Sequence, residues 1–197
     1  MFTGIIETTG TVLELIQSNS NLDLWIGSKL SHELKIDQSV AHNGVCLTVV
    51  ELRENAHRVT AIAETLAKTN LGSLAIGHKM NIERCMMANG RFDGHIVQGH
   101  VDDWATCSKI EDKNGSWEFE FTLNQKQQAD LLVAKGSICI NGTSLTVVQC
   151  DGNIFSVAII PYTYEHTNFK GLEIGDAVNL EFDILGKYIQ KQLANRA

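Results

Sequence analysis

The chain has 197 residues, of which 44% are hydrophobic and 20% are charged, a composition typical of a globular protein rather than a disordered one. Sixteen lysines and arginines against 23 aspartates and glutamates leave a net charge of −7, and no dense basic run occurs. Surfaces for nucleic acid or for anionic membranes need clustered positive charge, so the composition argues against both kinds of partner.

The first ten residues, MFTGIIETTG, contain no cationic flank followed by an apolar stretch. No apolar run in the chain approaches the roughly 18 residues that a membrane-spanning helix needs. The sequence therefore predicts neither a secretory signal nor a membrane span, and we expect cytoplasmic residence.

Short runs rich in β-branched and aromatic residues dominate the chain, and pairs such as Asn-Gly and Gly-Asp separate them. Several such runs about ten residues apart indicate small closed barrels or sandwiches, because closure removes exposed strand edges. In chain order the predicted strands are 5–15, 22–26, 46–52, 59–62, 80–83, 117–123, 138–140, 145–148, 154–160 and 177–182.

Helical patterns are confined to a few segments, with short helical stretches predicted at 28–34, 64–71 and 124–135. In the tail, 184–197, apolar residues fall at helical spacing between lysines and glutamines, which predicts an amphipathic helix. Such a helix packs on its own domain or on a neighbouring subunit, and we favour the second. Its apolar residues are Ile184, Leu185, Tyr188, Ile189 and Leu193.

One octapeptide occurs twice, as NGVCLTVV from Asn43 and as NGTSLTVV from Asn141, so the offset is 141 − 43 = 98 residues. The same offset matches residues 34–83 with the second half without an insertion. The first residues, 4–11, match 99–106 at an offset of 95. A period of this length is the size of a whole small domain rather than of a solenoid repeat.

The repeat predicts two similar domains and one unrepeated segment. The boundary falls within 86–91, where the hydrophobic pattern lapses around a glycine. We therefore expect one small barrel or sandwich over residues 1–88, a second over 89–183 and a C-terminal oligomerisation helix over 184–197.

Five cysteines, an odd number without a Cys-x-x-Cys pair, fit neither a disulfide framework nor a zinc finger. In a reducing compartment most of them would be small buried hydrophobes. We predict no metal site. The cysteines are Cys46, Cys85, Cys107, Cys139 and Cys150.

The residues alone show no phosphate loop, metal cluster or Ser-His-Asp signature. His95 and His100, in GHIVQGH, would point to opposite faces of a strand, so a shared zinc ion is not expected and a structural hydrogen-bonding role is favoured. Cys46 by itself is more typical of a core position than of a nucleophile. Composition and spacing therefore lead to a duplicated all-β protein.

Six segments spread over the whole chain carry a more specific signal. They are MFTGI at the start, SVAHNGVCLTV from Ser39, ETLAKTNLG from Glu64, GHIVQGHVD from Gly94, NGTSLTV from Asn141 and GDAVNLEFDILGKY from Gly175. In this order they resemble the landmarks of the riboflavin synthase family. Any one of them is a weak signal, whereas six in order are specific.

This resemblance implies an all-β fold of two tandem, internally duplicated six-stranded Greek-key barrels followed by a C-terminal α-helix. It implies a homotrimer assembled through that helix. Each barrel would bind one molecule of 6,7-dimethyl-8-ribityllumazine, and the active site would form where the first barrel of one subunit meets the second barrel of the next.

The implied reaction is a dismutation in which a four-carbon unit passes between two lumazines, giving riboflavin and 5-amino-6-ribitylamino-uracil. No cofactor is implied, because the lumazine itself stabilises the anion formed when its C7 methyl group loses a proton. Either barrel is compatible with the donor role, and several residues with removal of the methyl proton.

The resemblance implies catalytic roles for Cys46, His100 and Asp183, with Phe2 and Ser39 close by. A histidine near its usual pKa suits a proton shuttle, which favours His100 for that role. Asp183 is explained nearly as well as the N-cap of the tail helix.

Backbone groups and threonine hydroxyls of the repeated motifs suit the pyrimidine edge and the ribityl chain of a lumazine. By the same resemblance, the first pocket would use Gly4, Ile5, Ile6, Cys46, Leu47, Thr48, Thr60, Ala61, Ile62, Ala63, Glu64 and Thr65. The second would use Gly99, His100, Val101, Lys135, Ser144, Leu145, Thr146, Ile160, Pro161, Tyr162, Thr163, Tyr164 and Glu165.

Four positions depart from the family pattern. Asn141, where aspartate is usual, and Asp93, where glycine is common, are interpreted as turn substitutions that keep the backbone shape, since both residue types tolerate left-handed conformations. Tyr162 and Tyr164 flank Thr163 and would change affinity in the second pocket without changing the reaction.

Two other classes share part of this pattern. A non-catalytic carrier of the lumazine-protein type has the twin barrels but typically lacks some reactive positions, so the joint presence of Phe2, Cys46, His100 and Asp183 favours the enzyme. A structural or adaptor protein with duplicated barrels would have no reason to keep both pocket motifs.

Overall fold

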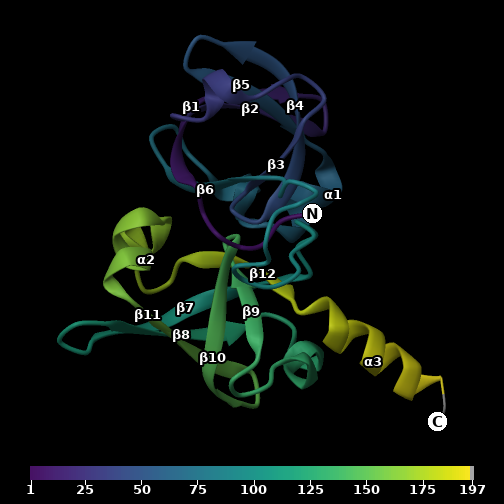
Figure 1. The fold of residues 1–197 in the computed structure, drawn as a ribbon, viewed down its shortest axis with the longest axis vertical. Coiled ribbons are helices and arrows are strands. Elements are labelled where there is room, and N and C mark those ends of the chain that lie inside the picture. Colours follow the sequence, from purple (N-terminus) through teal and green to yellow (C-terminus); the bar gives the residue numbers. More distant parts are fainter. Residues whose placement is uncertain (196–197) are drawn as a thin grey trace.

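Two closed antiparallel barrels, one above the other in Figure 1, make up the computed structural model, which describes residues 1–195. The strand order is β1-β2-β5-β4-β3-β6 in the first barrel and, from the equivalent strand, β7-β8-β11-β10-β9-β12 in the second. The predicted pair of six-stranded barrels is therefore confirmed, and the two barrels share one topology.

The strands of the first barrel are β1 (Thr8–Ser18), β2 (Asn21–Gly27), β3 (Ser39–His42), β4 (Val45–Arg53), β5 (Ala56–Ala61) and β6 (Lys79–Arg84). Those of the second are β7 (Asp103–Asp112), β8 (Trp117–Leu123), β9 (Ser137–Ile140), β10 (Thr143–Asp151), β11 (Ile154–Ile159) and β12 (Ala177–Phe182).

The helices are short except for the last one. Both barrels carry one α-helix, α1 (Ala63–Lys68) and α2 (Pro161–His166), each followed by a 3₁₀ turn, η2 (Asn70–Ser73) and η4 (Asn168–Gly171). The other elements are the 3₁₀ turns η1 (Ser31–Glu33) and η3 (Lys126–Leu131) and the C-terminal helix α3 (Ile184–Ala194).

The structure corrects several predicted elements. The helices expected at 28–34 and 124–135 are only the 3₁₀ turns η1 and η3. The sequence pattern missed β3, which has four residues, and β7, whose outward face reads as a polar loop. The helix predicted over 184–197 is confirmed up to Ala194, and residues 196 and 197 lie outside the described part.

Equivalent bulges bend both sheets. The register of β1 shifts between Val12 and Glu14, and that of β7 shifts at the matching place, between Cys107 and Lys109. A second pair of bulges lies in β4 and β10, at the offset of 98 residues. A bulge increases local bend and twist, which a six-stranded sheet needs in order to close on itself.

The two barrel cores differ in chemistry although their backbones match. The second core is built around five phenylalanines, and in the first the large buried side chains are mostly aliphatic. The first core also contains two polar side chains, His42 and His57, which are fully buried. The matching residues of the second barrel, 98 positions further on, are Ile140 and Phe155.

The hydrogen bonds of this histidine pair fix its protonation. His42 Nδ1 lies 3.1 Å from the carbonyl oxygen of Val40, which only accepts, so this nitrogen carries a proton. His42 Nε2 then accepts from His57 Nε2 at 2.8 Å, and His57 Nδ1 accepts from the Ser31 hydroxyl at 2.9 Å. Burial lowers the pKa of His57 to about 4 and that of His42 well below its usual value, so both rings are neutral near pH 7.

Six asparagines join the two barrels around a local two-fold axis. Asn81 Nδ2 donates to the carbonyl oxygen of Asn141 at 2.8 Å, and the equivalent Asn179 Nδ2 donates to that of Asn43 at 2.9 Å. The same two amides also donate to side-chain oxygens in η4 and η2, at 2.9 Å each. All buried amides of the interface are thus paired, as burial requires. The six are Asn43, Asn70, Asn81, Asn141, Asn168 and Asn179.

Gly44 and Gly142 lie directly against each other across the interface between the barrels. A Cβ on Gly44 would stand 2.7 Å from the nitrogen of Gly142, and one on Gly142 would stand 2.8 Å from the nitrogen of Gly44. Asn141 precedes this point with a φ of +46°, so its interpretation as a turn substitution holds. For Asp93 the same interpretation is wrong, since its φ is not positive.

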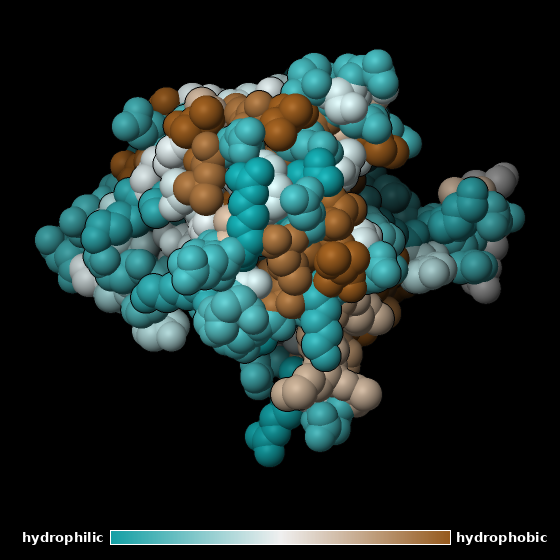
Figure 2. Space-filling view, turned by 90° about the horizontal axis from the view of Figure 1, so that it is seen from above, coloured by the Kyte–Doolittle hydropathy of each residue, from teal (hydrophilic) through white to brown (hydrophobic). Residues whose placement is uncertain are grey.

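The helix α3 projects from the second barrel as a separate arm in both views (Figures 1 and 2). Asp183 caps its N-terminus by accepting a hydrogen bond from the nitrogen of Leu185 at 3.0 Å. Leu185, Tyr188, Ile189 and Leu193 are each more than 60% exposed. On the face seen in Figure 2, the barrels show apolar residues in separate patches among hydrophilic ones.

Within residues 1–195, no helix has both the length and the apolar character to cross a membrane.

The buried histidine pair predicts acid-sensitive stability. Because both native pKa values lie below the usual 6.5, the unfolded chain takes up protons first as the pH falls. The contribution of the pair to stability is therefore constant above about pH 6.5 and decreases from there toward pH 4, by up to about 1.4 kcal/mol per pH unit for each histidine.

Urea unfolding at pH 7.5 and pH 5.0 measures this loss. The matched control is S31A/H42I/H57F, which gives the first barrel the residues found in the second at 129, 140 and 155. We expect the triple variant to lose less stability between the two pH values. Equal losses in parent and variant would show that other groups carry the pH dependence.

Candidate functional site

Two buried carboxylates hold two equivalent backbone segments between the barrels. Glu83, 4% exposed, accepts hydrogen bonds from the nitrogens of Thr3 and Gly4 at 2.7 and 3.0 Å. Glu181, 2% exposed, accepts from the nitrogens of Gln98, Gly99 and His100 at 2.6, 2.8 and 2.9 Å. Burial raises the pKa of both carboxyl groups, and the N–H donors act against this rise by stabilising the charged form.

The segment at Gly99 lies against Cys46 in β4. The carbonyl oxygen of Gly99 accepts a hydrogen bond from the nitrogen of Cys46 at 2.9 Å. A Cβ on Gly99 would stand 2.5 Å from the Cβ of Cys46 and 2.9 Å from the ring of Phe2. Only glycine fits this contact, and Phe2, fully buried, forms its floor.

The segment at Gly4 lies in the same way against Ser144 in β10. The carbonyl oxygen of Gly4 accepts a hydrogen bond from the nitrogen of Ser144 at 2.8 Å. A Cβ on Gly4 would stand 2.6 Å from the Cβ of Ser144. The two matched octapeptides are therefore each covered by one glycine segment.

These contacts correct the predicted composition of the two pockets. The sequence assigned residues 4–6 to the pocket of Cys46 and residues 99–101 to that of Ser144. The structure exchanges them, and Val101 packs against the core of the first barrel. The reason is the antiparallel bridge between Phe2 and Val97, where the two segments pass each other and each reaches the barrel of the other half.

His95 is the main difference between the two pockets. Its Nδ1 lies 2.7 Å from the hydroxyl oxygen of Ser144, and its buried Nε2 has no hydrogen-bond partner among the described residues. Burial lowers the pKa of His95, while the nearby carboxylate of Asp183 acts in the opposite direction. Cys46 has no histidine bonded to it in residues 1–195.

Cys46 itself is held as a thiol. Burial raises its pKa, and the nearby Cys85 and Glu181 add to the rise, while a hydrogen bond with Ser39 opposes it. Ser39 lies in β3 opposite Thr48, which is two residues along β4 from Cys46. The Cys46 sulfur therefore shapes the first pocket as a half-buried neutral group.

The other predicted pocket residues divide by burial. Leu47 and Ala61 lie in the first core, and Leu145 packs against the second, so their side chains face away from any surface ligand. Exposed positions are Thr48, Ile62, Ala63, Glu64, His100, Lys135, Thr146, Ile160, Pro161, Tyr162 and Glu165, and half-buried positions include Thr60, Thr65 and Thr163.

The helices α1 and α2 start at matching places beside the two pockets. Ile62 and Ile160 precede them, 52% and 59% exposed. Tyr164 stacks on Trp117 with ring centroids 3.8 Å apart, so this departure from the family pattern serves packing. Tyr162 stacks on His166 at 4.1 Å and stays exposed.

A cleft of about 740 Å³ opens beside α2 and contains three of the predicted residues. Another, of about 550 Å³, lies on the two-fold axis and contains none of them. The residues that line the cleft beside α2 include Ile6, Glu7, Lys29, Tyr162, Glu165 and His166.

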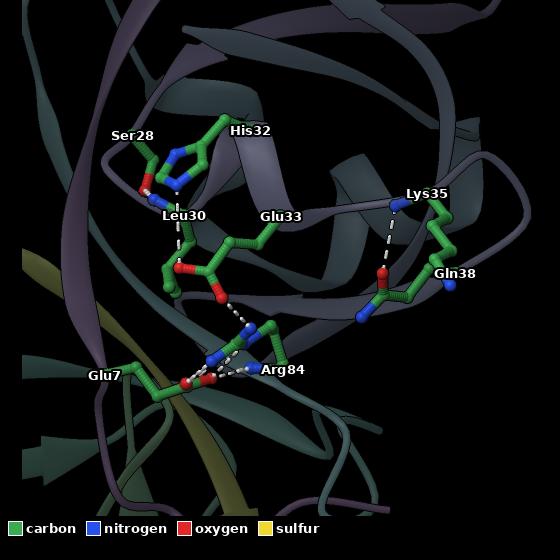
Figure 3. Close-up of polar contacts among 8 residues, drawn as sticks. All are labelled: Glu7, Ser28, Leu30, His32, Glu33, Lys35, Gln38 and Arg84. Carbon is green, nitrogen blue, oxygen red and sulfur yellow. Dashed lines mark hydrogen bonds and ion pairs between the residues drawn. The ribbon is translucent and has the colours of Figure 1, made fainter.

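An ion-pair network borders the segment at Gly4 (Figure 3). Arg84, at the end of β6, contacts Glu7 with Nη2 to Oε2 at 2.6 Å and Glu33 with Nη1 to Oε2 at 2.8 Å. The nitrogen of Arg84 also donates to Glu7 at 2.7 Å. Burial opposes ionisation of Glu7, but the bonds to Arg84 outweigh it and lower its pKa.

Sequence reasoning assigned His95 a structural role and placed it on a strand with His100. The segment forms only the isolated bridge at Val97, because Glu181 rather than a neighbouring strand takes its N–H groups. As a result His95 is buried and His100 is exposed. The one signal for His95 in the sequence was its absence from the first repeat.

Comparison with known proteins agrees with this geometry. A family model described as "Lumazine binding domain" matches residues 3–85 and again 98–183. Crystal structures of LumP share the fold: the complex with riboflavin has a TM-score of 0.87 at 20% identity, covering 92% of this chain and 99% of LumP. Fold and repeated match define a protein with two lumazine-binding domains in tandem.

The riboflavin synthase of Actinobacillus pleuropneumoniae is 40% identical over 197 residues, which are 100% of this chain and 91% of the relative. That of Bacillus subtilis (strain 168) is 39% identical over 98% of this chain and 90% of the relative. That of Saccharomyces cerevisiae is 37% identical over 98% and 86%. The chain belongs to the riboflavin synthase family, which confirms the resemblance of the six motifs.

The raised pKa of Cys46 predicts a slow thiol. At pH 8 we expect iodoacetamide to alkylate it in the native protein more slowly than in the urea-unfolded chain, by about tenfold for each unit of the rise, because only the thiolate reacts. Mass spectrometry of the peptide containing Cys46 gives both rates. Equal rates in the native and unfolded chains would show that the fold does not raise the pKa of Cys46, and a faster native rate would show an activated thiol.

Proposed function

We propose that this chain is a riboflavin synthase that converts two molecules of 6,7-dimethyl-8-ribityllumazine into riboflavin and 5-amino-6-ribitylamino-uracil. Relatives with that name are 37–40% identical over nearly its whole length. No cofactor takes part, since the conjugated lumazine stabilises its own anion. The lumazine-protein alternative rests on structures that are about 20% identical and share only the fold.

The proposal rests on one observation: two equivalent glycine segments cover two equivalent positions that carry different side chains. Cys46 and Ser144 occupy equivalent positions, each with its own glycine segment and its own buried carboxylate. Within residues 1–195, Ser144 has a histidine bonded to it and Cys46 has none. A dismutation binds two identical molecules and treats them differently, and this arrangement meets both requirements.

Ser144 and His95 together suit proton transfer. With its pKa lowered by burial, His95 is neutral near pH 7 and can accept a proton through the Ser144 hydroxyl. Its Nε2 is buried and has no hydrogen-bond partner among the described residues, so proton transfer to this ring would run through Nδ1 and the Ser144 hydroxyl. Positioned acid–base groups of this kind contribute about 10²–10⁴-fold.

Orientation supplies the larger part of the rate. Holding two reactants in the correct geometry is worth about 7–11 kcal/mol when the site is rigid. The glycine segments, fixed by charge-assisted hydrogen bonds to Glu83 and Glu181, provide such a frame.

We assign the remaining predicted catalytic residues as follows. Cys46 and Ser39 shape the first pocket, and Phe2 supports Gly99 from below. Asp183 caps α3 and places its charge near His95. The exposed side chain of His100 is available to a lumazine or to a neighbouring subunit.

We propose that the chain works as a homotrimer held by α3, with each active site formed by the first barrel of one subunit and the second barrel of the next. The exposed apolar stripe on α3 has no cover within the described residues. Ile62, Ile160 and Tyr162, beside the pockets, are also exposed in one chain. Apolar surface of this kind marks interfaces.

We place the protein in the cytoplasm, where its five free thiols stay reduced.

The function predicts turnover without any added cofactor. Purified protein incubated with 6,7-dimethyl-8-ribityllumazine should form one riboflavin for every two lumazines consumed, followed by absorbance and chromatography. A fluorescence change of the ligand without riboflavin formation would instead support a carrier.

Matched substitutions locate the chemistry. S144A should lower turnover by about 10²-fold or more, because it removes the partner of His95, whereas C46S should lower it by less than about tenfold, because it keeps a small polar group in a pocket where the thiol stays neutral. D183A tests the charge near His95. Equal losses for S144A and C46S would contradict the different roles.

The trimer predicts that I189D separates the subunits, because a charge would be buried in an apolar interface. Light scattering after gel filtration should give three chains for the parent and one for the variant. Q190D, on the polar side of the same helix, is the control and should stay trimeric. A parent that elutes as one chain would contradict the trimer directly.

A further inference from the structure

We propose that Lys187 is a positioning residue that fixes the 99–101 segment over the first pocket and so links the C-terminal helix to that pocket. The description of the segment as part of a pocket rests on the proposed function. The contacts that hold it are independent of any reaction.

The ammonium group of Lys187 reaches from α3 to the end of the segment. Its Nζ lies 2.6 Å from Oδ2 of Asp102, and the two side chains are 23% and 22% exposed. The same oxygen accepts a hydrogen bond from the nitrogen of Phe182 at 2.9 Å. Asp102 directly follows Val101, so its carboxylate anchors the end of the segment that Glu181 does not reach.

The first half of the chain contains the equivalent carboxylate, and it too is paired with a cation. Glu7 is the equivalent of Asp102 at the offset of 95 (102 − 7), and its carboxylate accepts from the nitrogen of Arg84 at 2.7 Å as Asp102 does from Phe182. There the cation is the side chain of Arg84 itself (Figure 3). In the second half that position is Phe182, a core residue, and the cation comes from α3 instead.

Lys187 also acts on the other anchor of the same segment. Burial raises the pKa of Glu181, and the charge of Lys187 is among the influences that lower it. One ammonium group thereby acts on both carboxylates that hold residues 98–102, by direct contact with Asp102 and through its charge on Glu181. A cation shared by two partly desolvated carboxylates has more effect than an exposed surface pair.

The consequence is a connection between distant parts of the chain. The held segment lies on Cys46 of the first barrel, whereas the cation that fixes it belongs to α3, which starts from the second barrel. Displacement of α3 would release Asp102 and loosen the cover of the first pocket. The segment at Gly4, whose cation is Arg84, would keep its place.

Hydrogen exchange measured by mass spectrometry tests this directly. In K187Q we expect exchange at residues 98–101 to quicken by about tenfold, while residues 3–6 keep the parent rate. R84Q is the matched control and should show the reverse pattern. K187R should restore slow exchange, since it returns a cation to Asp102.

Either of two results overturns the proposal: unchanged exchange at 98–101 in K187Q, or equal quickening of both segments, which indicates a general loss of stability. Ligand binding adds a second readout, for which riboflavin is the probe. In fluorescence titrations K187Q should weaken its binding by about fivefold and K187R should recover it. If the parent neither binds riboflavin nor converts the lumazine, the proposed function fails, and the exchange data still decide the role of Lys187.

Discussion

The arrangement of both pockets depends on one interaction, a buried carboxylate that collects the N–H groups of a chain segment without a neighbouring strand. Glu83 and Glu181 do this in equivalent places, and hydrogen bonds to a charged group are worth about 1.5–3 kcal/mol each. The segments cannot join a sheet, because Gly4 and Gly99 turn with positive φ against the opposite barrel. The carboxylates therefore accept the hydrogen bonds that a neighbouring strand would otherwise accept. Each glycine segment can then lie over the pocket of the other barrel.

This exchange explains why the barrels stay together. Each pocket needs a glycine segment from the other half, and the interface is sealed by asparagines that satisfy one another across the two-fold axis. An isolated barrel would expose these amides and lose the cover over Cys46 or Ser144. Duplication has thus produced one structural unit rather than two independent domains joined by a linker.

Much of this was predictable from the sequence, and the failures have physical causes. The repeat predicted two similar domains and the short strands predicted barrels or sandwiches, because hydrophobic alternation and turn residues are local properties. The family resemblance added the six-stranded barrels, and the α3 helix followed from its spacing. The strand β7 was missed because polar side chains alternate along its outer face, and β3 because four residues carry little pattern. The exchange of the glycine segments and the bond between His95 and Ser144 depend on the crossing at Phe2 and Val97, a tertiary contact that leaves no local signal.

The differences between the two pockets arise from the parts of the chain that are not repeated. The connection between β6 and β7 supplies His95 to Ser144, and α3 supplies Lys187 to Asp102 and the cap residue Asp183 near His95. Within the repeats, Cys46 differs from Ser144 by a single atom type, which changes hydrogen bonding but leaves the backbone unchanged. In the proposed function, the two equivalent pockets would bind two copies of one molecule, and the unrepeated segments would make one copy chemically distinct from the other. Because these segments lie outside the twelve strands that close the barrels, they can carry that distinction without changing the strand topology.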